Sequence, residues 1–167
     1  LYPSAFAFKY PKAGEKNSKV TLLIANLLTN SSKEVKLDNY EYIPLIRWTN
    51  TSDNVAIVTL NRRQNKLNII SINSSDNSKK NLLQETDSCY VDVDKIEDLT
   101  FLKDNSFIFQ SEKNGFNHLY HYNASGKLKT QITNGNWQVT RFYGLDKKEG
   151  KLFYQSTTDG STNRTIY

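Results

Sequence analysis

The chain has 167 residues, which suits one ordinary domain or part of a larger one. Hydrophobic residues make up 37%, enough for a packed core, and the absence of a run of about 18 apolar residues excludes a membrane-spanning helix. The formal net charge is +5, but Lys and Arg do not cluster, so we expect a solvated basic surface and no nucleic-acid partner. The single cysteine, Cys89, excludes an internal disulfide and a cysteine-based metal site.

The opening residues, LYPSAFAFKYPKAG, contain neither the basic region nor the apolar region of a signal peptide. They are therefore interpreted as the start of an excised segment or mature fragment, with any targeting signal outside the sequence.

Short runs with alternating apolar and polar residues then follow one another, and each is predicted to be a strand. Turns rich in Asn, Asp, Lys and Ser separate them. In chain order the runs are 20–28, 33–38, 43–49, 55–61, 66–73, 81–86, 96–102, 106–112, 117–123, 128–133, 138–146, 151–157 and 163–167.

These runs repeat in one order, with a period near 40 to 50 residues. Leu22, Leu67, Leu119 and Ile166 occupy matching places in the third strands and are 45, 52 and 47 residues apart. A period of this size with four strands per unit is typical of β-propeller blades. The sequence therefore predicts an all-β fold, a β-propeller fragment of repeated four-stranded antiparallel blades.

Two complete blades and two partial ones are expected, over residues 20–38 (partial), 43–86, 96–133 and 138–167 (partial). A closed propeller needs at least about four blades, so this chain is too short to close. The alternative is a stand-alone antiparallel sandwich, which has similar turn spacing but needs no internal period.

Candidate catalytic and metal-binding residues are few. No G-x-S-x-G elbow and no phosphate-binding Gly loop occur. His118 and His121 are three positions apart, so on a strand they point to opposite faces and are expected to serve packing or hydrogen bonding. Asp92 and Asp94 would share a face if their acidic stretch is extended; they suit Ca²⁺, but a solvated loop is the simpler interpretation.

Five N-x-[ST] sequons are present, and they would matter only in a secretory eukaryote. They lie at Asn30, Asn50, Asn73, Asn123 and Asn163.

Four phrases, in order along the chain, resemble the N-terminal propeller of the dipeptidyl peptidase IV family of serine exopeptidases. They are YPKAGEKN (10–17), NRRQNKL (61–67), SEKNGFNHLYHY (111–122) and ITNGNWQV (132–139). YPKAG and the pair formed by the last two phrases are the specific ones, and the resemblance extends over essentially the whole chain.

The resemblance implies an eight-bladed propeller that caps an α/β-hydrolase domain and shapes the access of short peptides to it. The hydrolase domain of the family removes X-Pro or X-Ala dipeptides from peptide N-termini. The Ser-Asp-His triad lies downstream of these phrases in the family, and the acidic pair that binds the substrate amine lies upstream. Accordingly we assign no catalytic, metal, cofactor or substrate-binding residue to this chain, and we expect no enzymatic activity from it alone.

One family feature within range is changed. Animal-type relatives carry a Phe-Arg pair of the substrate pocket just before the strand that matches NSFIFQ, and here that stretch is CYVDVDKIEDL (89–99). The lack of disulfides also differs from animal-type propellers. Both departures favour a bacterial relative in the periplasm or cell envelope.

The leading hypothesis is thus a non-catalytic propeller segment, with the hydrolase domain, the remaining blades and peptide substrates as its partners. The alternative is a stand-alone propeller scaffold for protein–protein interaction.

Local expectations follow from the repeat. Trp48, Phe101 and Phe142 are predicted to be buried between blades. In the hairpin SEKNGFNHLY, Gly115 should have positive φ, Glu112 and Lys113 should face solvent, and Leu119 and His118 should point to opposite faces. The outer faces of the end blades should be apolar, which predicts self-association.

Overall fold

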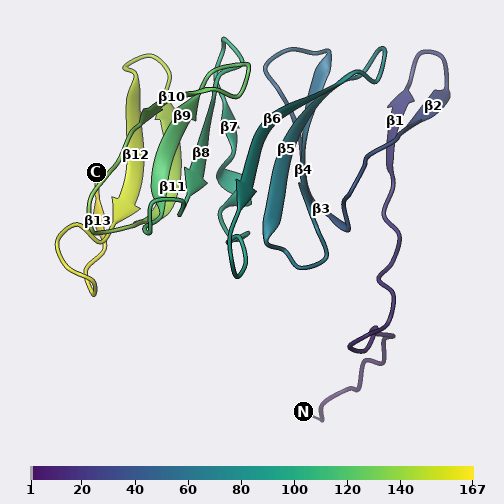
Figure 1. Cartoon of the computed structure of the whole chain (residues 1–167), viewed down its shortest axis with the longest axis horizontal. Helices are drawn as coiled ribbons and strands as arrows, with labels where there is room; N and C mark the ends of the chain where they lie inside the picture. Colours follow the sequence, from purple (N-terminus) through teal and green to yellow (C-terminus); the bar gives the residue numbers. More distant parts are fainter. Residues whose placement is uncertain (1) are drawn as a thin grey trace.

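The computed structural model describes residues 2–167 as a row of antiparallel sheets (Figure 1). The strands are β1 (Leu22–Asn26), β2 (Ser31–Val35), β3 (Tyr42–Trp48), β4 (Asn54–Leu60), β5 (Lys66–Asn73), β6 (Lys79–Thr86), β7 (Thr100–Phe101), β8 (Phe107–Ser111), β9 (His118–Tyr122), β10 (Leu128–Gln131), β11 (Val139–Asp146), β12 (Lys151–Ser156) and β13 (Thr165–Ile166). One short 3-10 helix, η1 (Ile96–Asp98), precedes β7.

The strands form four sheets in chain order. The first sheet is β1-β2, the second β3-β4-β5-β6, the third β7-β8-β9-β10 and the fourth β11-β12-β13. Each connection from one sheet to the next leaves the last strand of a sheet and enters the first strand of the next one. This is the blade order of a β-propeller, with two complete blades and two partial ones, as the sequence predicted.

Successive side chains of a strand point to opposite faces of its sheet, so each sheet can pack against a neighbouring sheet on both sides. In β4 all residues from Val55 to Leu60 are buried. Val55 and Ile57 pack against the first sheet, whereas Ala56 and Val58 pack toward the third. An inner blade therefore has two buried faces and cannot be stable without both neighbours.

The apolar core accordingly lies between the sheets rather than within one of them. Each buried side chain of this kind contributes about 1.5–3 kcal/mol. The cluster between the first and second sheets contains Leu22, Val35, Val55, Ile57 and Ile72. The cluster between the second and third contains Ala56, Val58, Leu60, Leu67, Ile69, Leu82, Ile96, Leu99, Phe101, Phe107, Phe109, Tyr120 and Tyr122. The cluster between the third and fourth contains Ile108, Leu119, Val139 and Phe142.

The hairpin between β8 and β9 has the expected turn. Gly115 has φ +94° and its N–H donates to the carbonyl of Glu112 at 2.7 Å. Glu112 and Lys113 are exposed, and Leu119 packs toward the fourth sheet. Positive φ is strained for residues with a side chain but not for glycine, which is why Gly occupies this position. The Asn-Gly pair therefore located the turn correctly.

The structure corrects two predictions. Residues 96–102 were expected to form one strand, but 96–98 form η1 and β7 contains only Thr100 and Phe101. Arg47 explains the change, because its guanidinium donates to the carbonyls of Glu97 and Leu99 and so satisfies backbone groups that a strand would otherwise pair.

The second correction concerns Trp48. Phe101 and Phe142 are 7% exposed and confirm the prediction of burial, but Trp48 is 58% exposed. Alternation along β3 puts Trp48 on the same side as Ile46, which is 52% exposed, while Arg47 points inward to η1. The prediction for Trp48 was therefore wrong.

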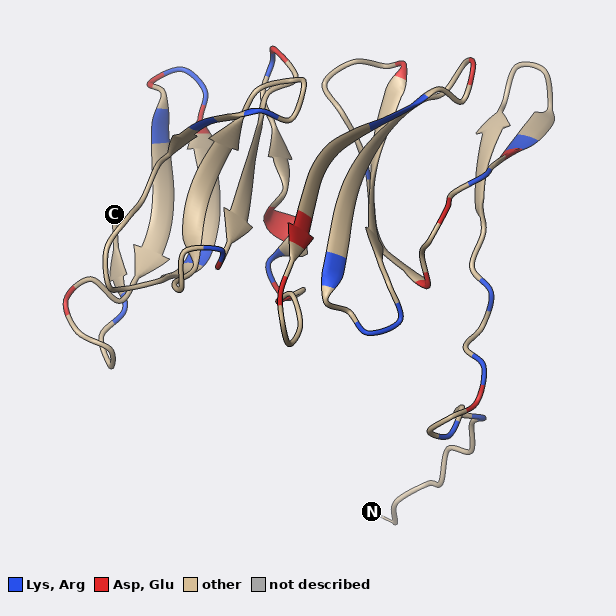
Figure 2. Cartoon of the chain, viewed as in Figure 1, with Lys and Arg blue, Asp and Glu red and all other residues tan. Residues whose placement is uncertain are grey.

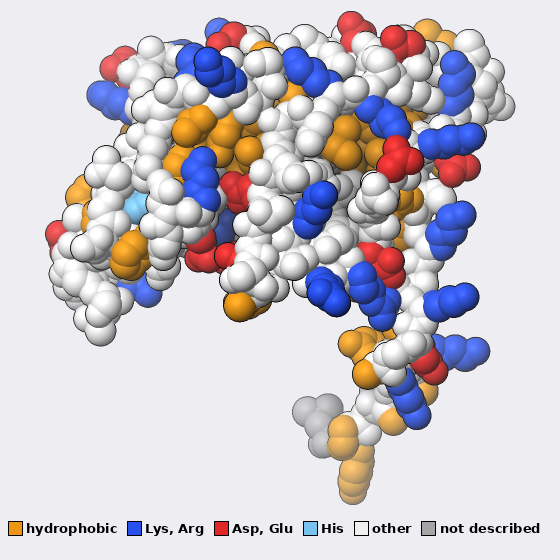
Figure 3. All heavy atoms as spheres, viewed as in Figure 1, with side chains coloured by type: hydrophobic (Ala, Val, Ile, Leu, Met, Phe, Trp, Pro, Cys, Tyr) orange, Lys and Arg blue, Asp and Glu red, His pale blue; other side chains and the backbone are white. Residues whose placement is uncertain are grey.

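Charged side chains gather in the turns and at strand ends (Figure 2). The segment before β1 carries exposed aromatic side chains, visible as the hydrophobic tail in Figure 3; they include Tyr2, Phe6, Phe8 and Tyr10. No helix among residues 2–167 has the length and apolarity needed to cross a bilayer.

Candidate functional site

A cavity of about 300 Å³ opens between the second and third sheets, beneath the loop of residues 87–95 that connects them. We call this segment the connecting loop. The cavity is lined by the end of β6, the connecting loop, the end of β8 and the hairpin turn. Its lining residues are Leu83, Gln84, Glu85, Thr86, Asp87, Tyr90, Val91, Asp92, Lys95, Gln110, Ser111, Glu112, Lys113, Asn117 and Tyr122.

A charged group from each sheet meets at the base of this cavity. Lys113 Nζ donates to the hydroxyl of Tyr122 at 2.9 Å and lies 3.9 Å from the ring centroid of Tyr120. Glu85 faces it from β6, and its Oε1 is buried without a hydrogen-bond partner among residues 2–167. The arrangement places an ammonium group between a carboxylate and two aromatic faces, a setting in which cation–π attraction is strengthened by desolvation.

Burial governs the protonation of this cluster. It raises the pKa of Glu85, and Ser111 and Lys113 offset only part of the effect. Burial likewise lowers the pKa of Lys113 and raises that of Tyr122. Burial therefore disfavours the charged forms of both Glu85 and Lys113. Such shifts are frequent in binding sites and also in structural ion pairs.

At the rim, Glu112 adds a further carboxylate. Its pKa is raised by burial first, and then by the negative charges of Asp92 and Asp87. The rim is consequently acidic on the side of the connecting loop.

A second polar network joins η1, the third sheet and the start of the fourth sheet. Gln110 donates to the carboxylate of Asp98, and Asn117 Nδ2 donates to Gln110 Oε1 at 2.9 Å and to the carbonyl of Val139 at 2.8 Å. Burial raises the pKa of Asp98, against the lowering effect of Gln110 and of the nearby cations Lys95, Arg141 and Arg47. This network fixes how η1 and the start of β11 sit against the third sheet.

The two histidines have separate surroundings. His118 Nε2 donates to the carbonyl of Gly135 at 3.1 Å, and its Nδ1 lies 3.0 Å from Thr133 Oγ1. The ring is edge-on to Trp137 at 5.0 Å between centroids. His121 Nε2 lies 2.9 Å from Ser106 Oγ, and burial lowers the pKa of His121. Both rings are hydrogen-bonded, as the sequence suggested.

The acidic stretch is a loop rather than a strand. Asp92 is half-buried, Asp94 is exposed, and the backbone N–H of Asp94 donates to Asp92 Oδ1 at 2.9 Å. Within residues 2–167 no group of three or more His, Cys, Asp or Glu side chains is arranged to hold a metal ion. Cys89 is exposed.

The sequon asparagines differ in what they already bind. Asn50 Nδ2 donates to the carbonyls of Phe101 and Leu102, and Asn163 Nδ2 donates to that of Asp159. Asn73 and Asn123 use Oδ1 to accept backbone N–H groups of their turns, and Asn30 lies exposed in a turn with φ +49°.

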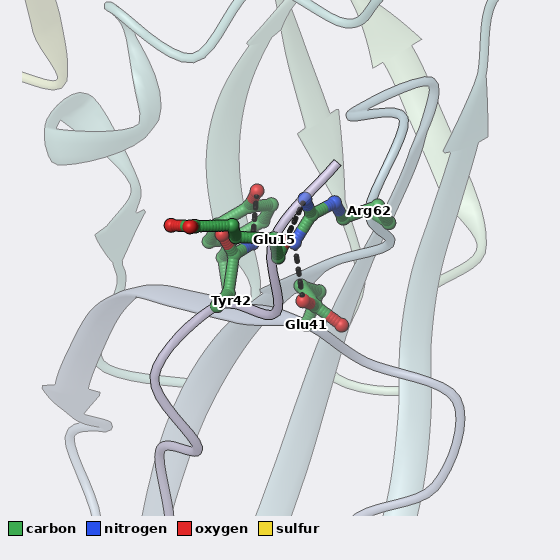
Figure 4. Close-up of polar contacts among 5 residues, drawn as sticks. Glu15, Glu41, Tyr42 and Arg62 are labelled. Atoms are coloured by element: carbon green, nitrogen blue, oxygen red, sulfur yellow. Dashed lines mark hydrogen bonds and ion pairs between the residues drawn. The ribbon is translucent and has the colours of Figure 1, made fainter. Parts of the chain in front are cut away.

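Arg62 fastens the N-terminal segment to the second sheet (Figure 4). Its guanidinium donates to the carbonyl of Glu15 at 3.0 Å and to Glu41 Oε1 at 3.0 Å. Asn17 Nδ2 also donates to the hydroxyl of Tyr42, at 2.7 Å. Both partners of the Arg62–Glu41 pair are partly exposed, so the pair positions the segment more than it stabilises the fold.

Sequence reasoning did not identify Glu85, Lys113 and Tyr122 as neighbours. Lys113 and Tyr122 flank one hairpin, and that spacing could have been noticed. Glu85 belongs to the preceding sheet, and its approach depends on how two blades pack.

Comparisons with known proteins agree with this architecture. The family model described as "Dipeptidyl peptidase IV (DPP IV) N-terminal region" matches residues 1–167. The probable dipeptidyl peptidase 4 of Aspergillus flavus is 28% identical over 178 residues, and that of Emericella nidulans is 25% identical over 181 residues. Each alignment covers 99% of this chain and 23% of the relative.

A solved structure matches over the whole chain. The crystal structure of Porphyromonas gingivalis dipeptidyl peptidase 4 superposes with a TM-score of 0.92 at 41% identity, covering 100% of this chain and 24% of that one. The chain thus spans about a quarter of the length of these relatives. On the match of the family model to all of its residues, the chain belongs to the dipeptidyl peptidase IV family, as an N-terminal propeller region.

Proposed function

We propose that this chain is the non-catalytic propeller segment of a serine exopeptidase that removes X-Pro or X-Ala dipeptides from peptide N-termini. The observation that carries the proposal is the match of the N-terminal region of this family to residues 1–167. The relatives bear the name dipeptidyl peptidase 4. In this proposal the nucleophile and base come from an α/β-hydrolase domain, because the sequence has no G-x-S-x-G elbow.

The segment's role in the proposal is to shape the access of peptide substrates. By the family resemblance, the connecting loop overlaps the stretch 89–99 in which animal-type relatives carry their Phe-Arg pair. The loop borders the open cavity between the second and third sheets. Loops at the end of a rigid β-scaffold commonly carry specificity. The acidic rim and Tyr90 would then act on the part of a peptide that extends beyond the cleaved dipeptide.

The partners in this proposal are the hydrolase domain and the remaining blades of the full-length protein. The proposed location is the bacterial periplasm or cell envelope, supported by the single cysteine, since propellers with several disulfides are the animal type. Fractionation of cells that express the full-length protein would test the location.

Steady-state kinetics of the full-length protein test the function. Tyr90→Ala removes an exposed side chain of the cavity rim, and Leu28→Ala removes one in the turn between β1 and β2, outside the cavity. We expect Tyr90→Ala to change KM for longer X-Pro peptides while kcat on a dipeptide chromogenic substrate stays the same, because the loop acts on binding only. Leu28→Ala should change neither constant.

Two results would contradict the proposal at different levels. If Tyr90→Ala leaves KM unchanged for every peptide length, the connecting loop does not shape access. If the full-length protein has no dipeptidyl peptidase activity and no nucleophile elbow, the alternative of a propeller scaffold for protein–protein interaction is preferred.

A further inference from the structure

We propose that Asn134 is a site of spontaneous deamidation, and that the fold favours succinimide formation there over the chain's other Asn-Gly pair and its Asp-Gly pair. The sequence contains three such pairs: Asn114–Gly115, Asn134–Gly135 and Asp159–Gly160. All three lie in exposed turns or loops. Sequence alone ranks the two Asn-Gly pairs equally, so any difference between them has to come from the structure.

The reaction needs the backbone nitrogen after the asparagine as a nucleophile. This nitrogen loses its proton to a solvent base and attacks the side-chain Cγ, forming a five-membered succinimide while the Cγ–Nδ2 bond breaks and ammonia leaves with a proton from solvent. Water then adds to one of the ring carbonyls, and the ring opens to aspartate or isoaspartate. One water is consumed and one ammonia is released, with no oxidant or reductant.

Two of the three pairs have this nitrogen engaged. The N–H of Gly115 donates to the carbonyl of Glu112 at 2.7 Å, and the N–H of Gly160 donates to that of Thr157 at 3.1 Å. Asn114 is further restrained because its Nδ2 donates to Gln131 Oε1 at 3.0 Å. Attack in either turn first requires the loss of a backbone hydrogen bond.

Asn134–Gly135 has neither restraint. Within residues 2–167 the N–H of Gly135 makes no hydrogen bond, and the side chain of Asn134 makes none either. Gly135 itself has φ +129°, a conformation open to glycine. No hydrogen bond therefore has to break before the Gly135 nitrogen attacks the side chain of Asn134, although the Trp137 ring packs on Gly135.

Conversion would alter a structured part of the molecule. The carbonyl of Gly135 accepts the hydrogen bond from His118 Nε2 at 3.1 Å, and Trp137 packs edge-on against the same ring. Isoaspartate at position 134 lengthens the backbone by one carbon atom in the residue before Gly135 and adds a negative charge. The modification would thus act on the connection between the third and fourth sheets.

Peptide mapping by mass spectrometry of the folded chain, aged in mildly alkaline buffer, tests the inference. A parallel sample aged in urea is unfolded, so its deamidation rates at Asn114 and Asn134 depend on the local sequence alone. In the folded sample, relative to urea, we expect Asn134 to react about two- to tenfold faster than Asn114, the ratio that corresponds to one net hydrogen bond of about 0.5–1.5 kcal/mol. An Asn134→Gln variant should lose the modified 130–141 peptide and keep the slow reaction at Asn114.

Equal rates at Asn114 and Asn134 in the folded sample, after correction by the urea rates, would overturn the proposal. A faster reaction at Asn114 would overturn it as well. Asp159 gives an independent comparison, because the N–H of Gly160 is hydrogen-bonded like that of Gly115. Isomerisation of Asp159 through the same ring should therefore be slower in the folded chain than in urea.

Discussion

The backbone carbonyl oxygen of Leu82 lies where a side chain at Gly126 would begin. An ideal Cβ built on Gly126 would be 1.8 Å from that oxygen, far inside contact distance. Leu82 belongs to β6 of the second sheet, and Gly126 lies in the turn between β9 and β10 of the third. Two blades are therefore in backbone contact at this point, where Lys80 Nζ also donates to the carbonyl of Ala124 at 3.4 Å.

Gly126→Ala should destabilise the chain by about 3 kcal/mol or more, because positive φ and a clash with backbone act together. Gly115→Ala is the matched control, since Gly115 has similar φ but no atom within 4 Å of its Cβ position. The control should lose only about 1–2 kcal/mol. Urea unfolding of both variants measures the difference, and equal losses would show that the contact between Leu82 and Gly126 is not a constraint.

Replacing aromatic residues by alanine should lower the free energy of unfolding much more at the buried positions than at the exposed one. Phe101→Ala and Phe142→Ala should each lower the free energy of unfolding by about 3–5 kcal/mol, as expected for buried Phe. Trp48→Ala should cost less than about 1 kcal/mol, because more than half of its side chain is already in water. Chemical denaturation provides the values. A large loss for Trp48 would mean that it is covered in solution.

Glu85→Gln should stabilise the fold at pH 7 and have little effect below the ordinary carboxyl pKa of 4.5. Burial raises the pKa of Glu85 in the folded state, so the folded chain binds this proton more tightly than the unfolded chain. Stability tied to the proton is complete below the unfolded pKa and is lost as pH rises through the folded one. Glutamine resembles the protonated form and escapes this loss.

Unfolding curves of the wild type and Glu85→Gln at pH 7 and near pH 4 check this expectation, with Glu34→Gln on the exposed strand β2 as the control. A destabilised Glu85→Gln at pH 7 would show that attraction to Lys113 outweighs the cost of burying the carboxylate.

The chain by itself should not hydrolyse Gly-Pro or Ala-Pro chromogenic substrates. A serine peptidase needs an activated nucleophile and a base, and binding alone does not replace them. A purified sample is compared with buffer and with a sample treated with a serine-directed inhibitor. Inhibitor-sensitive turnover above buffer would contradict the prediction.

The outer faces of the end sheets should promote self-association. Tyr143 and Phe153 are each 45% exposed on the fourth sheet, and Leu23 is exposed on the first. Apolar side chains exposed on the face of a blade that lacks its neighbour favour association in solution. Light scattering during size-exclusion chromatography should show a mass that rises with concentration, and Phe153→Lys should reduce the rise. A constant monomer mass would refute the prediction.

The repeat could be predicted from the sequence because every blade needs the same alternation of apolar and polar residues along its strands. Leu22, Leu67, Leu119 and Ile166 lie in β1, β5, β9 and β13, which are equivalent strands of successive sheets. The short strand β7 was not readable. Its shape depends on Arg47 reaching η1 from the preceding sheet, and a contact between residues about 50 positions apart leaves no local pattern.

Prediction of the candidate site from the sequence was limited in the same way, because the site depends on contacts between two sheets. The acidic character of the connecting loop was evident from Asp87 and Asp92, but the cavity beneath it exists only because two sheets meet. Lys113 was predicted to face solvent and is exposed, yet its amino group turns back over Tyr120. Long side chains can satisfy both descriptions, because their stem and their head occupy different surroundings.

The placement of the cores between sheets also determines how this molecule would respond to a pulling force. Because each sheet is held only by its immediate neighbours, tension applied at the two ends would detach sheets one after another instead of breaking all contacts together. The first sheet, with two strands and a small shared cluster, would yield early. The second and third sheets share the largest cluster and would separate last, so the force trace would contain successive peaks rather than a single rupture.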